Sequence, residues 1–304
     1  MEEAVRLLAA GEVVGLPTET VYGLGADALN PLACARIFEA KERPLFDPLI
    51  VHLPDREWLD RLARPGALAV RLAEAFWPGP LTVVLPRREV VPDLVTSGQE
   101  TVALRMSGHS VFQQVARTLG RPIAAPSANR FGRISPTTAA HVVSELEGRI
   151  PLVLDGGPCP HGIESTIVWV SDQGLSILRH GPVTEEQLAA FGEVKTPDPA
   201  MAAPGNLKSH YAPRTPLEIL PAPGLIPESI DRTGLLAWSH SGTGFARVEH
   251  LSRSGDLREA AANLYGAMRR LDEAGLQNIL AEPVPETGLG VAIMERLRKA
   301  AARE

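Results

Sequence analysis

Residues 12–25 read EVVGLPTETVYGLG, and this stretch decides how the first half of the chain is interpreted. The apolar run Glu12–Leu16 predicts a strand that ends at Pro17. The hydroxyl-bearing residues that follow it, together with Gly23 and Gly25, indicate a loop that can line a pocket with little steric obstruction. A plain turn between two elements explains the same pattern, so these residues alone leave both interpretations open.

Working outward, short apolar runs alternate with helix-like stretches up to residue 195, and several strands follow one another directly. This order is typical of an α/β (α+β) domain with a mixed sheet. The further strands are predicted at Leu49–Leu53, Leu81–Leu85, Val102–Arg105, Pro122–Ala125, Leu152–Leu154, Ser165–Val170 and Leu175–Leu178. The helices are predicted at Glu2–Ala10, Asn30–Lys41 with Asn30 as its N-cap, Ala67–Phe76, Ser110–Leu119, Thr137–Glu147 and Glu185–Ala190.

A proline-rich stretch divides the chain. Residues 192–216 contain five prolines in a loop-like run, which is typical of an extended, semi-rigid linker. We therefore predict a first domain at 1–195, a linker at 196–216 and a small α/β domain of parallel strands at 217–304. The elements predicted for that small domain are strands at Leu217–Leu220, Gly234–Trp238 and Asn278–Ala281, and helices at Asp256–Glu273 and Leu289–Ala301.

Composition excludes several classes of protein. The 304 residues carry 30 Lys and Arg against 36 Asp and Glu, a net charge of −6, which argues against a protein that coats nucleic acid. No apolar run is long enough to predict a membrane span. Cys34 and Cys159 lie far apart and form no zinc-binding pair. An acidic N-terminus without a signal-peptide pattern completes the expectation of a cytoplasmic protein.

Lys41 and Arg43 form the first candidate anion site, because they lie two apart before a proline-stiffened loop. In an extended segment both would point the same way and grip successive phosphates. Cations that complement a helix dipole are the alternative. The chain has only four Lys against 26 Arg, which favours a specific use for Lys41. We expect Lys41 to be an exposed cation whose removal leaves the fold intact.

Two other segments place polar groups at element ends. Arg105 is the only charge of its predicted strand and suits either a carboxylate fork or a surface ion pair. Ser135, before Pro136, is predicted as the N-cap of the next helix, an arrangement that can also bind phosphate. Cys159 and His161 alone do not make a metal site. The sequence has no phosphate loop of the G-x-x-x-x-G-K-[ST] type, no dinucleotide fingerprint and no nucleophile elbow.

The segments taken together resemble a known family. PTETVYGLG, KERPLFDPLIVH, WPGPLTVVLP, ALR, APSAN, SPT and GIESTIV occur in the order and approximate spacing of the YrdC-like L-threonylcarbamoyladenylate synthases. The PGNLKSHYAP linker and the tail resemble the two-domain branch of that family. The resemblance implies a twisted mixed sheet with a concave basic surface, followed by a small Rossmann-like domain. It implies the reaction of L-threonine, bicarbonate or CO2, and ATP to threonylcarbamoyl-AMP and pyrophosphate.

The resemblance also implies roles for individual residues. The catalytic set is the K-x-R and S-x-N pairs Lys41, Arg43, Ser127 and Asn129. The ATP contacts are Arg43, Asp47, Thr101, Ser127, Ser135, Arg179 and Tyr211. The threonine contacts are Thr20, His52, Arg105, the backbone near Ala125, and Ser165, with Arg105 on the α-carboxylate and hydroxyl groups reading the side chain.

Further expectations concern cofactor and partners. A Mg²⁺ ion is expected on the ATP phosphates, held more by the nucleotide than by the protein. Asp47 stands where the family often has Asn. The linker, with Lys208 and Tyr211, is expected to fold over the nucleotide. Partners are the downstream tRNA threonylcarbamoyl-transfer machinery and weakly bound RNA, with no membrane. Two alternatives are a YrdC-type carbamoyltransferase, disfavoured because zinc-binding Cys pairs are lacking, and a non-catalytic RNA-binding module.

Overall fold

A computed structural model describes residues 1–171, 174–197, 210–222, 230–239 and 241–302. The chain divides into two compact units. The first comprises Met1–Phe131, Pro136–Cys159 and Glu164–Asn206, and the second comprises Gly132–Ser135, Pro160–Ile163 and Leu207–Glu304. None of the helices in the described ranges combines the length and the apolar character needed to cross a bilayer.

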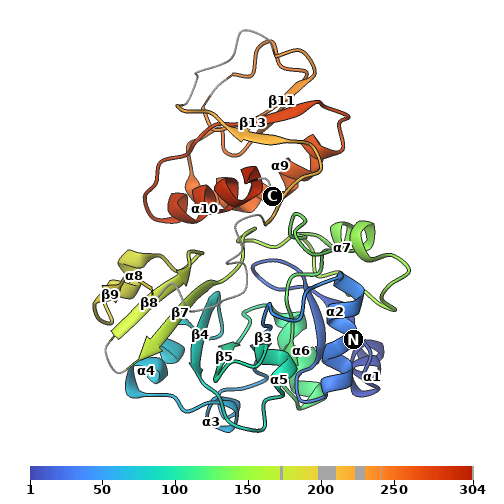
Figure 1. The fold of residues 1–304 in the computed structure, drawn as a ribbon, viewed down its shortest axis with the longest axis vertical. Coiled ribbons are helices and arrows are strands. Elements are labelled where there is room, and N and C mark those ends of the chain that lie inside the picture. The colour runs from blue at the N-terminus through green and yellow to red at the C-terminus, as the bar shows by residue number, and fades with distance from the viewer. Residues whose placement is uncertain (172–173, 198–209, 223–229, 240, 303–304) are drawn as a thin grey trace. The chain divides into compact units, whose positions relative to one another are not determined.

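The first unit is built on one mixed sheet (Figure 1) with the strand order β1-β2-β6-β3-β5-β4-β7-β8-β9. Its parallel pairs are β3 with β5, β4 with β7, and β8 with β9. The mixed-sheet prediction is therefore confirmed. The strands are β1 Val14–Leu16, β2 Gly23–Asp27, β3 Ile50–His52, β4 Leu81–Pro86, β5 Thr101–Arg105, β6 Ile123–Ala124, β7 Thr166–Ser171, β8 Gly174–Arg179 and β9 Val194–Lys195.

The helices of this unit are α1 Glu2–Ala9, α2 Pro31–Lys41, α3 Trp58–Leu62, α4 Ala67–Phe76, α5 Asp93–Thr96, α6 Ser110–Leu119, α7 Ala139–Leu146 and α8 Glu185–Ala189. They contribute to more than one apolar cluster: α2 and α4 belong to the large core, with Phe38 and Leu72, whereas α1 and α6 belong to a separate cluster, with Leu8 and Phe112. Strand β4 shows the two faces of the sheet, since Val83 joins the large core, whereas Val84 joins a smaller cluster with Ala103. Because strand side chains alternate, Arg105 extends from the same face as Ala103.

Local sequence explains where α2 lies. The Asn30 side chain accepts the backbone amides of Leu32 and Ala33, and Pro31 occupies the first turn, as predicted. The helix ends where Glu42 adopts the left-handed conformation, with φ 54°. Lys41 is therefore the last helical residue, at the edge of the loop that carries Arg43.

Helix α7 begins later than the sequence indicates, so the assignment of Ser135 as its N-cap is wrong. Thr138 is the N-cap, and its side chain accepts the amide of His141. A hydroxyl three residues farther along therefore satisfies the free amide of the first turn. Ser135 is instead fully buried.

Residues Gly23–Asp27 form strand β2, although the sequence indicates a loop there. Gly25 is required for packing, because a Cβ at this position would lie 2.8 Å from Leu16 Cδ1 and 3.0 Å from Ile123 Cγ2. The glycine thus lets neighbouring side chains close over a central strand. The predicted strand at Leu152–Leu154 makes only an isolated bridge, between Gly15 and Val153.

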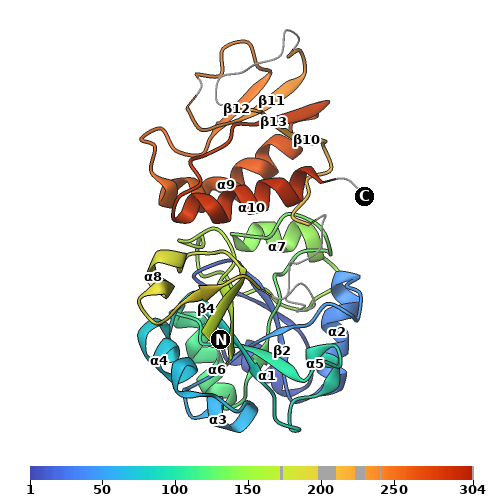
Figure 2. The same ribbon diagram turned by 60° about the vertical axis from the view of Figure 1, so that its left-hand side comes forward.

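The second unit contains a four-stranded sheet in the order β10-β13-β11-β12, and every strand pair in it is parallel, as predicted. Its strands are β10 Leu217–Ile219, β11 Thr233–Ala237, β12 Arg247–His250 and β13 Asn278–Ala281. Figure 2 shows α9 Leu257–Asp272 and α10 Leu289–Ala301 next to each other on one face of this sheet. Strand β12 was not predicted, because RVEH lacks an apolar run.

The close contacts of Gly25 predict that one added methyl group lowers the stability of the fold. Gly25→Ala should lower the free energy of unfolding by about 1–3 kcal/mol, because the surrounding side chains must move. In the matched control, Gly266→Ala within α9, the new Cβ meets only the tip of the Arg270 side chain, at 3.3 Å. The control should be neutral or stabilising by about 0.5–1 kcal/mol. Urea unfolding measures both, and equal effects would contradict this account of β2.

Candidate active site

A buried ion pair joins the end of β5 to the loop after β1. Arg105 Nη2 lies 2.6 Å from Glu19 Oε1, and Nη1 donates to Thr20 Oγ1 at 2.9 Å. Nε donates to the Gly79 carbonyl at 3.2 Å. All three residues Arg105, Glu19 and Thr20 are buried. Of the two interpretations of Arg105, a surface ion pair is therefore wrong: the partner is a carboxylate in the interior.

Glu19 is ionised despite its burial. Burial raises its pKa, but Arg105 and the Ser107 hydroxyl, which donates to Oε2 at 2.6 Å, together lower the pKa to about 2. A carboxylate held by charge and hydrogen bonds in this way is a fixed part of the site. Sequence reasoning did not single out Glu19 or Ser107, although a carboxylate within PTET and a lone Arg at a strand exit are complementary signals.

Two other residues predicted to contact threonine lie beside Arg105. His52 is the register partner of Arg105 in the β3–β5 ladder. Its ring is buried 4.8 Å from that of Phe112, and burial followed by the charge of Arg105 lowers its pKa to about 3. The imidazole is therefore neutral at physiological pH. Ala125, after β6, donates its amide to the Ile50 carbonyl at 2.9 Å, in the neighbouring strand.

Lys41 is buried, which corrects the expectation of an exposed cation. Its Nζ donates to the carbonyls of Ser127 and Asn129, both at 2.5 Å. Burial, and then the charge of Arg43, lower the Lys41 pKa well below its ordinary value. Removing the side chain would leave two carbonyls without their donor, so the fold would also be affected. The structure thus brings three of the four predicted catalytic residues together: Lys41 holds the loop of Ser127 and Asn129.

Arg43 and Asp47 form a second buried ion pair, with Arg43 Nη2 2.8 Å from Asp47 Oδ2. Arg43 Nε and Nη2 also donate to the carbonyls of Asp47 and Pro48, at 3.1 and 2.8 Å. Burial raises the pKa of Asp47, and Arg43, Lys41 and Arg179 oppose that rise. The argument that Lys41 and Arg43 share a direction in an extended segment is wrong, because a left-handed Glu42 separates a helix end from a loop.

Arg179, at the end of β8, contacts Ser165, which directly precedes β7. Arg179 Nη2 donates to Ser165 Oγ at 3.0 Å and to the Ser165 carbonyl at 2.9 Å. The Ser165 hydroxyl also contacts Thr82 Oγ1 at 2.8 Å. A residue predicted for ATP therefore touches one predicted for threonine. Thr101, by contrast, begins β5 beside Pro86 of β4, at the opposite end of the strand from Arg105.

The second unit holds two of the residues predicted to contact ATP, Ser135 and Tyr211. Tyr211 has φ 62°, and its buried ring stacks on Tyr265 at 5.7 Å under the Arg296 guanidinium. Residues 198–209 of the predicted linker, Lys208 among them, lie outside the described residues. The proposed contacts of Ser135 and Tyr211 with ATP stay predictions.

The described residues hold no group of three His, Cys, Asp or Glu side chains that could bind a metal ion. The Mg²⁺ prediction does not require such a group, because it places the ion on the phosphates. Asp47 is a carboxylate among the cations Lys41, Arg43 and Arg179, and it is paired with Arg43. This Mg²⁺ site stays a prediction.

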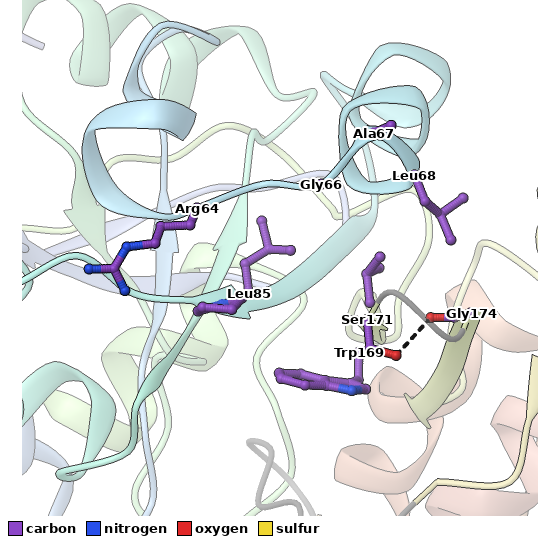
Figure 3. A pocket seen from close by; sticks show the side chains of 10 residues that line it. Arg64, Gly66, Ala67, Leu68, Leu85, Trp169, Ser171 and Gly174 are labelled. Atoms are coloured by element: carbon purple, nitrogen blue, oxygen red, sulfur yellow. Dashed lines mark hydrogen bonds between the residues drawn. The ribbon is translucent and has the colours of Figure 1, made fainter.

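A separate pocket of about 590 Å³ lies at the ends of β4 and β7 and the start of α4 (Figure 3). Leu68, Leu85 and Trp169 supply its apolar wall, and Arg64 its charge. None of the residues predicted for ATP or threonine lines it. Sequence reasoning did not indicate this pocket, because its lining comes from three segments that are far apart in the chain.

The Glu19–Arg105 pair predicts a pH-dependent contribution to stability. Glu19→Gln should lower the free energy of unfolding by about 3 kcal/mol at pH 7, because Arg105 loses its buried counter-charge. The pKa of Glu19 is lowered in the fold, from 4.5 to about 2. The difference between wild type and variant should therefore be complete above pH 4.5 and shrink as the pH falls toward 2. In the exposed pair Glu3–Arg6, Glu3→Gln should have no measurable effect. A pH-independent difference in urea unfolding for Glu19→Gln would contradict the ion-pair interpretation.

Known proteins resemble this chain in both sequence and fold. A family model described as "Telomere recombination" matches residues 6–181, and one described as "Threonylcarbamoyl-AMP synthase, C-terminal domain" matches residues 183–302. The chain is 42% identical to threonylcarbamoyl-AMP synthase of Bacillus subtilis, over 98% of this chain and 92% of that protein. It is 40% identical to the protein of that name from Pyrococcus abyssi, with the same coverage. A solved structure of Pyrococcus abyssi Sua5 complexed with L-threonine matches with a TM-score of 0.89 at 38% identity, over 98% of this chain and 93% of that one. The chain therefore belongs to the two-domain threonylcarbamoyl-AMP synthase family.

Proposed function

We propose that this protein is an L-threonylcarbamoyladenylate synthase, a nucleotidyltransferase that joins L-threonine, CO2 or bicarbonate, and ATP to give threonylcarbamoyl-AMP and pyrophosphate. The observation that carries the proposal is the buried set at the ends of β3 and β5. There Arg105 is held by Glu19 and Thr20, with His52 as its register partner. Family membership over the whole chain supports the same reaction.

The reaction needs positioning more than an activated protein nucleophile. The amine of threonine adds to CO2 and loses a proton to solvent, which gives a carbamate. A carbamate oxygen then attacks the α-phosphorus, and the bond to the β-phosphate oxygen breaks and releases pyrophosphate. The developing negative charge requires fixed cations. Arg43 and Arg179 are such cations, because each is buried and fixed by hydrogen bonds to carbonyl groups.

Lys41 has a distinct role in this proposal. An ammonium group has three N–H donors, and two of them go to the carbonyls of Ser127 and Asn129. The third is left for a phosphate oxygen. Lys41 would thus fix the S-x-N loop and present one donor to ATP at the same time. Mg²⁺ bound to the phosphates would supply additional charge neutralisation.

The partners and compartment form the finer part of the proposal. The product would pass to the machinery that transfers threonylcarbamoyl to the adenosine beside the anticodon in tRNAs that read codons beginning with A. The cytoplasm, where ATP, threonine and tRNA meet, is the proposed location. RNA binding by the protein itself would be weak, given the net charge of −6.

The two alternatives make different predictions. A carbamoyltransferase is not favoured, because the curated synthases match nearly the whole chain, whereas full-length HypF matches at 16% identity with a TM-score of 0.54 and shows the fold alone. A non-catalytic RNA-binding module would bind tRNA with a steep dependence on salt. A salt titration of tRNA binding separates that module from an enzyme.

Pyrophosphate release from ATP tests the proposed reaction directly. Release should require both L-threonine and bicarbonate, and the product should contain threonine, one carboxyl carbon and AMP. Release that is indifferent to threonine would refute the synthase proposal. Carbamoyl phosphate in place of bicarbonate and threonine tests the carbamoyltransferase alternative in the same assay.

Lys41 gives a residue-level prediction. Lys41→Ala should lower turnover at least tenfold and also lower the midpoint of thermal unfolding, because the side chain is buried and bonded to two carbonyls. Lys195→Ala removes an exposed Lys and is the matched control, which should alter neither. Assays run well below the unfolding midpoint separate the two effects. A folded Lys41→Ala protein with wild-type turnover would contradict the assignment.

A further inference from the structure

The hydroxyl of Thr18 has two possible acceptors within hydrogen-bond distance, the Val21 carbonyl and the Thr20 hydroxyl. Thr18 Oγ1 donates to the Val21 carbonyl at 2.6 Å, and a carbonyl can only accept. The same oxygen accepts the backbone amides of Thr20 and Val21, at 3.1 and 3.2 Å. Thr18 is buried, so this small turn is fixed within the site.

The direction of the hydrogen bond between Thr18 and Thr20 follows from these contacts. Thr18 Oγ1 and Thr20 Oγ1 lie 2.8 Å apart, which requires a hydrogen between them. Since the hydrogen of Thr18 serves the Val21 carbonyl, the hydrogen in the 2.8 Å contact comes from Thr20, and the two backbone amides at 3.1 and 3.2 Å share the other acceptor position of Thr18 Oγ1. Thr20 Oγ1 also accepts from Arg105 Nη1 at 2.9 Å. A hydroxyl has one hydrogen and two acceptor positions, so one acceptor position of Thr20 remains.

Arg105 has complementary capacity left. A guanidinium has five N–H groups. Within the described residues, three of those of Arg105 donate hydrogen bonds, to Gly79, Thr20 and Glu19. One N–H on each terminal nitrogen remains, which is the pair that a carboxylate accepts in a fork. An α-amino acid carries its amine and its carboxylate on the same carbon. The two N–H groups of Arg105 can therefore bind the carboxylate while the neighbouring Thr20 hydroxyl accepts a hydrogen bond from the amine.

We propose that Thr18 is a positioning residue, which fixes the Thr20 hydroxyl as an acceptor for an N–H of the amino group of L-threonine while Arg105 binds the carboxylate. This inference rests on the proposed function and deepens it. Thr20 then reads the amino group, and not the side-chain hydroxyl as the sequence resemblance implied.

The direction of this hydrogen bond matters for the chemistry. The amine must offer its lone pair to CO2: the N–C bond forms, one C–O π pair moves to oxygen, and the nitrogen loses a proton to solvent. An accepting Thr20 takes an N–H and leaves that lone pair available. A hydroxyl free to donate would bond the lone pair and oppose the reaction. Thr18 prevents this by holding the hydrogen of Thr20.

Ligand substitution tests the assignment of Thr20 without any change at Thr18. Calorimetry on the full chain compares wild type and Thr20→Val with L-threonine, with L-2-aminobutyrate, which lacks the side-chain hydroxyl, and with 3-hydroxybutanoate, which lacks the amine. Thr20→Val should weaken binding of the two amines by about the same factor, roughly tenfold more than it weakens binding of 3-hydroxybutanoate, which is affected only through the lost Thr20–Arg105 hydrogen bond. Weakening confined to the two ligands with a side-chain hydroxyl would overturn the proposal. A wild type that binds none of the three would instead refute the proposed function.

Turnover tests the role of Thr18. Thr18→Val should lower threonine-dependent pyrophosphate release about tenfold with the KM for ATP within twofold, and Thr18→Ser, which keeps the hydroxyl, should recover activity to within about threefold of wild type. In the Thr20→Val background, Thr18→Val should cost less than twofold further, because it acts through Thr20. The same cost in both backgrounds would overturn the proposal. If Thr18→Val does not fold, the ligand comparison still decides it.

Discussion

The buried ion pair between Glu19 and Arg105 is the interaction on which the rest of the site depends. Burying a charge is costly unless it is paired and hydrogen-bonded, and here both conditions are met at 2.6 Å. The pair joins the loop after β1 to the end of β5, and Ser107 and Thr20 complete its hydrogen bonds. These contacts allow a charged binding group to be kept in the interior in one fixed orientation. The proposed amino-acid site therefore has its charged group in a fixed orientation without a bound substrate.

The cations proposed to bind the phosphates of ATP are also held by hydrogen bonds. Lys41 and Arg43 are buried; Lys41 donates to backbone carbonyls of the loop of Ser127 and Asn129, and Arg43 donates to carbonyls of its own loop. Cations held in this way lose little conformational freedom when they meet a phosphate, which favours electrostatic stabilisation of the leaving group. The structure shows buried cations with hydrogen bonds to backbone carbonyls, and the expected concave basic surface stays a prediction. A net charge of −6 is compatible with these cations, because the hydrogen bonds of each one, and not the net charge of the chain, fix its position.

Local signals in the sequence predicted much of the fold. Asn30 before Pro31 located α2, and the periodic run Leu289–Ala301 located α10 within its observed bounds. What failed depended on contacts between distant segments. Glycine at 25 indicated a loop, but β2 exists because Leu16 and Ile123 close over it. Lys41 is buried against carbonyls more than eighty residues away, and Glu19 is paired with Arg105, which is also more than eighty residues away. The periodicity of a sequence does not indicate such long-range contacts. Family resemblance supplied the residue types of the site, and the structure supplied their partners and hydrogen-bond directions.

A crystal structure of this chain with L-threonine tests the central claim most directly, namely that a prearranged Arg105–Thr20 pair recognises an α-amino acid. The account predicts the substrate carboxylate on the two terminal nitrogens of Arg105 and the amino nitrogen within hydrogen-bond distance of Thr20 Oγ1, with the Glu19–Arg105 pair intact. Threonine bound with its side-chain hydroxyl on Thr20, or with its carboxylate away from Arg105, would contradict it.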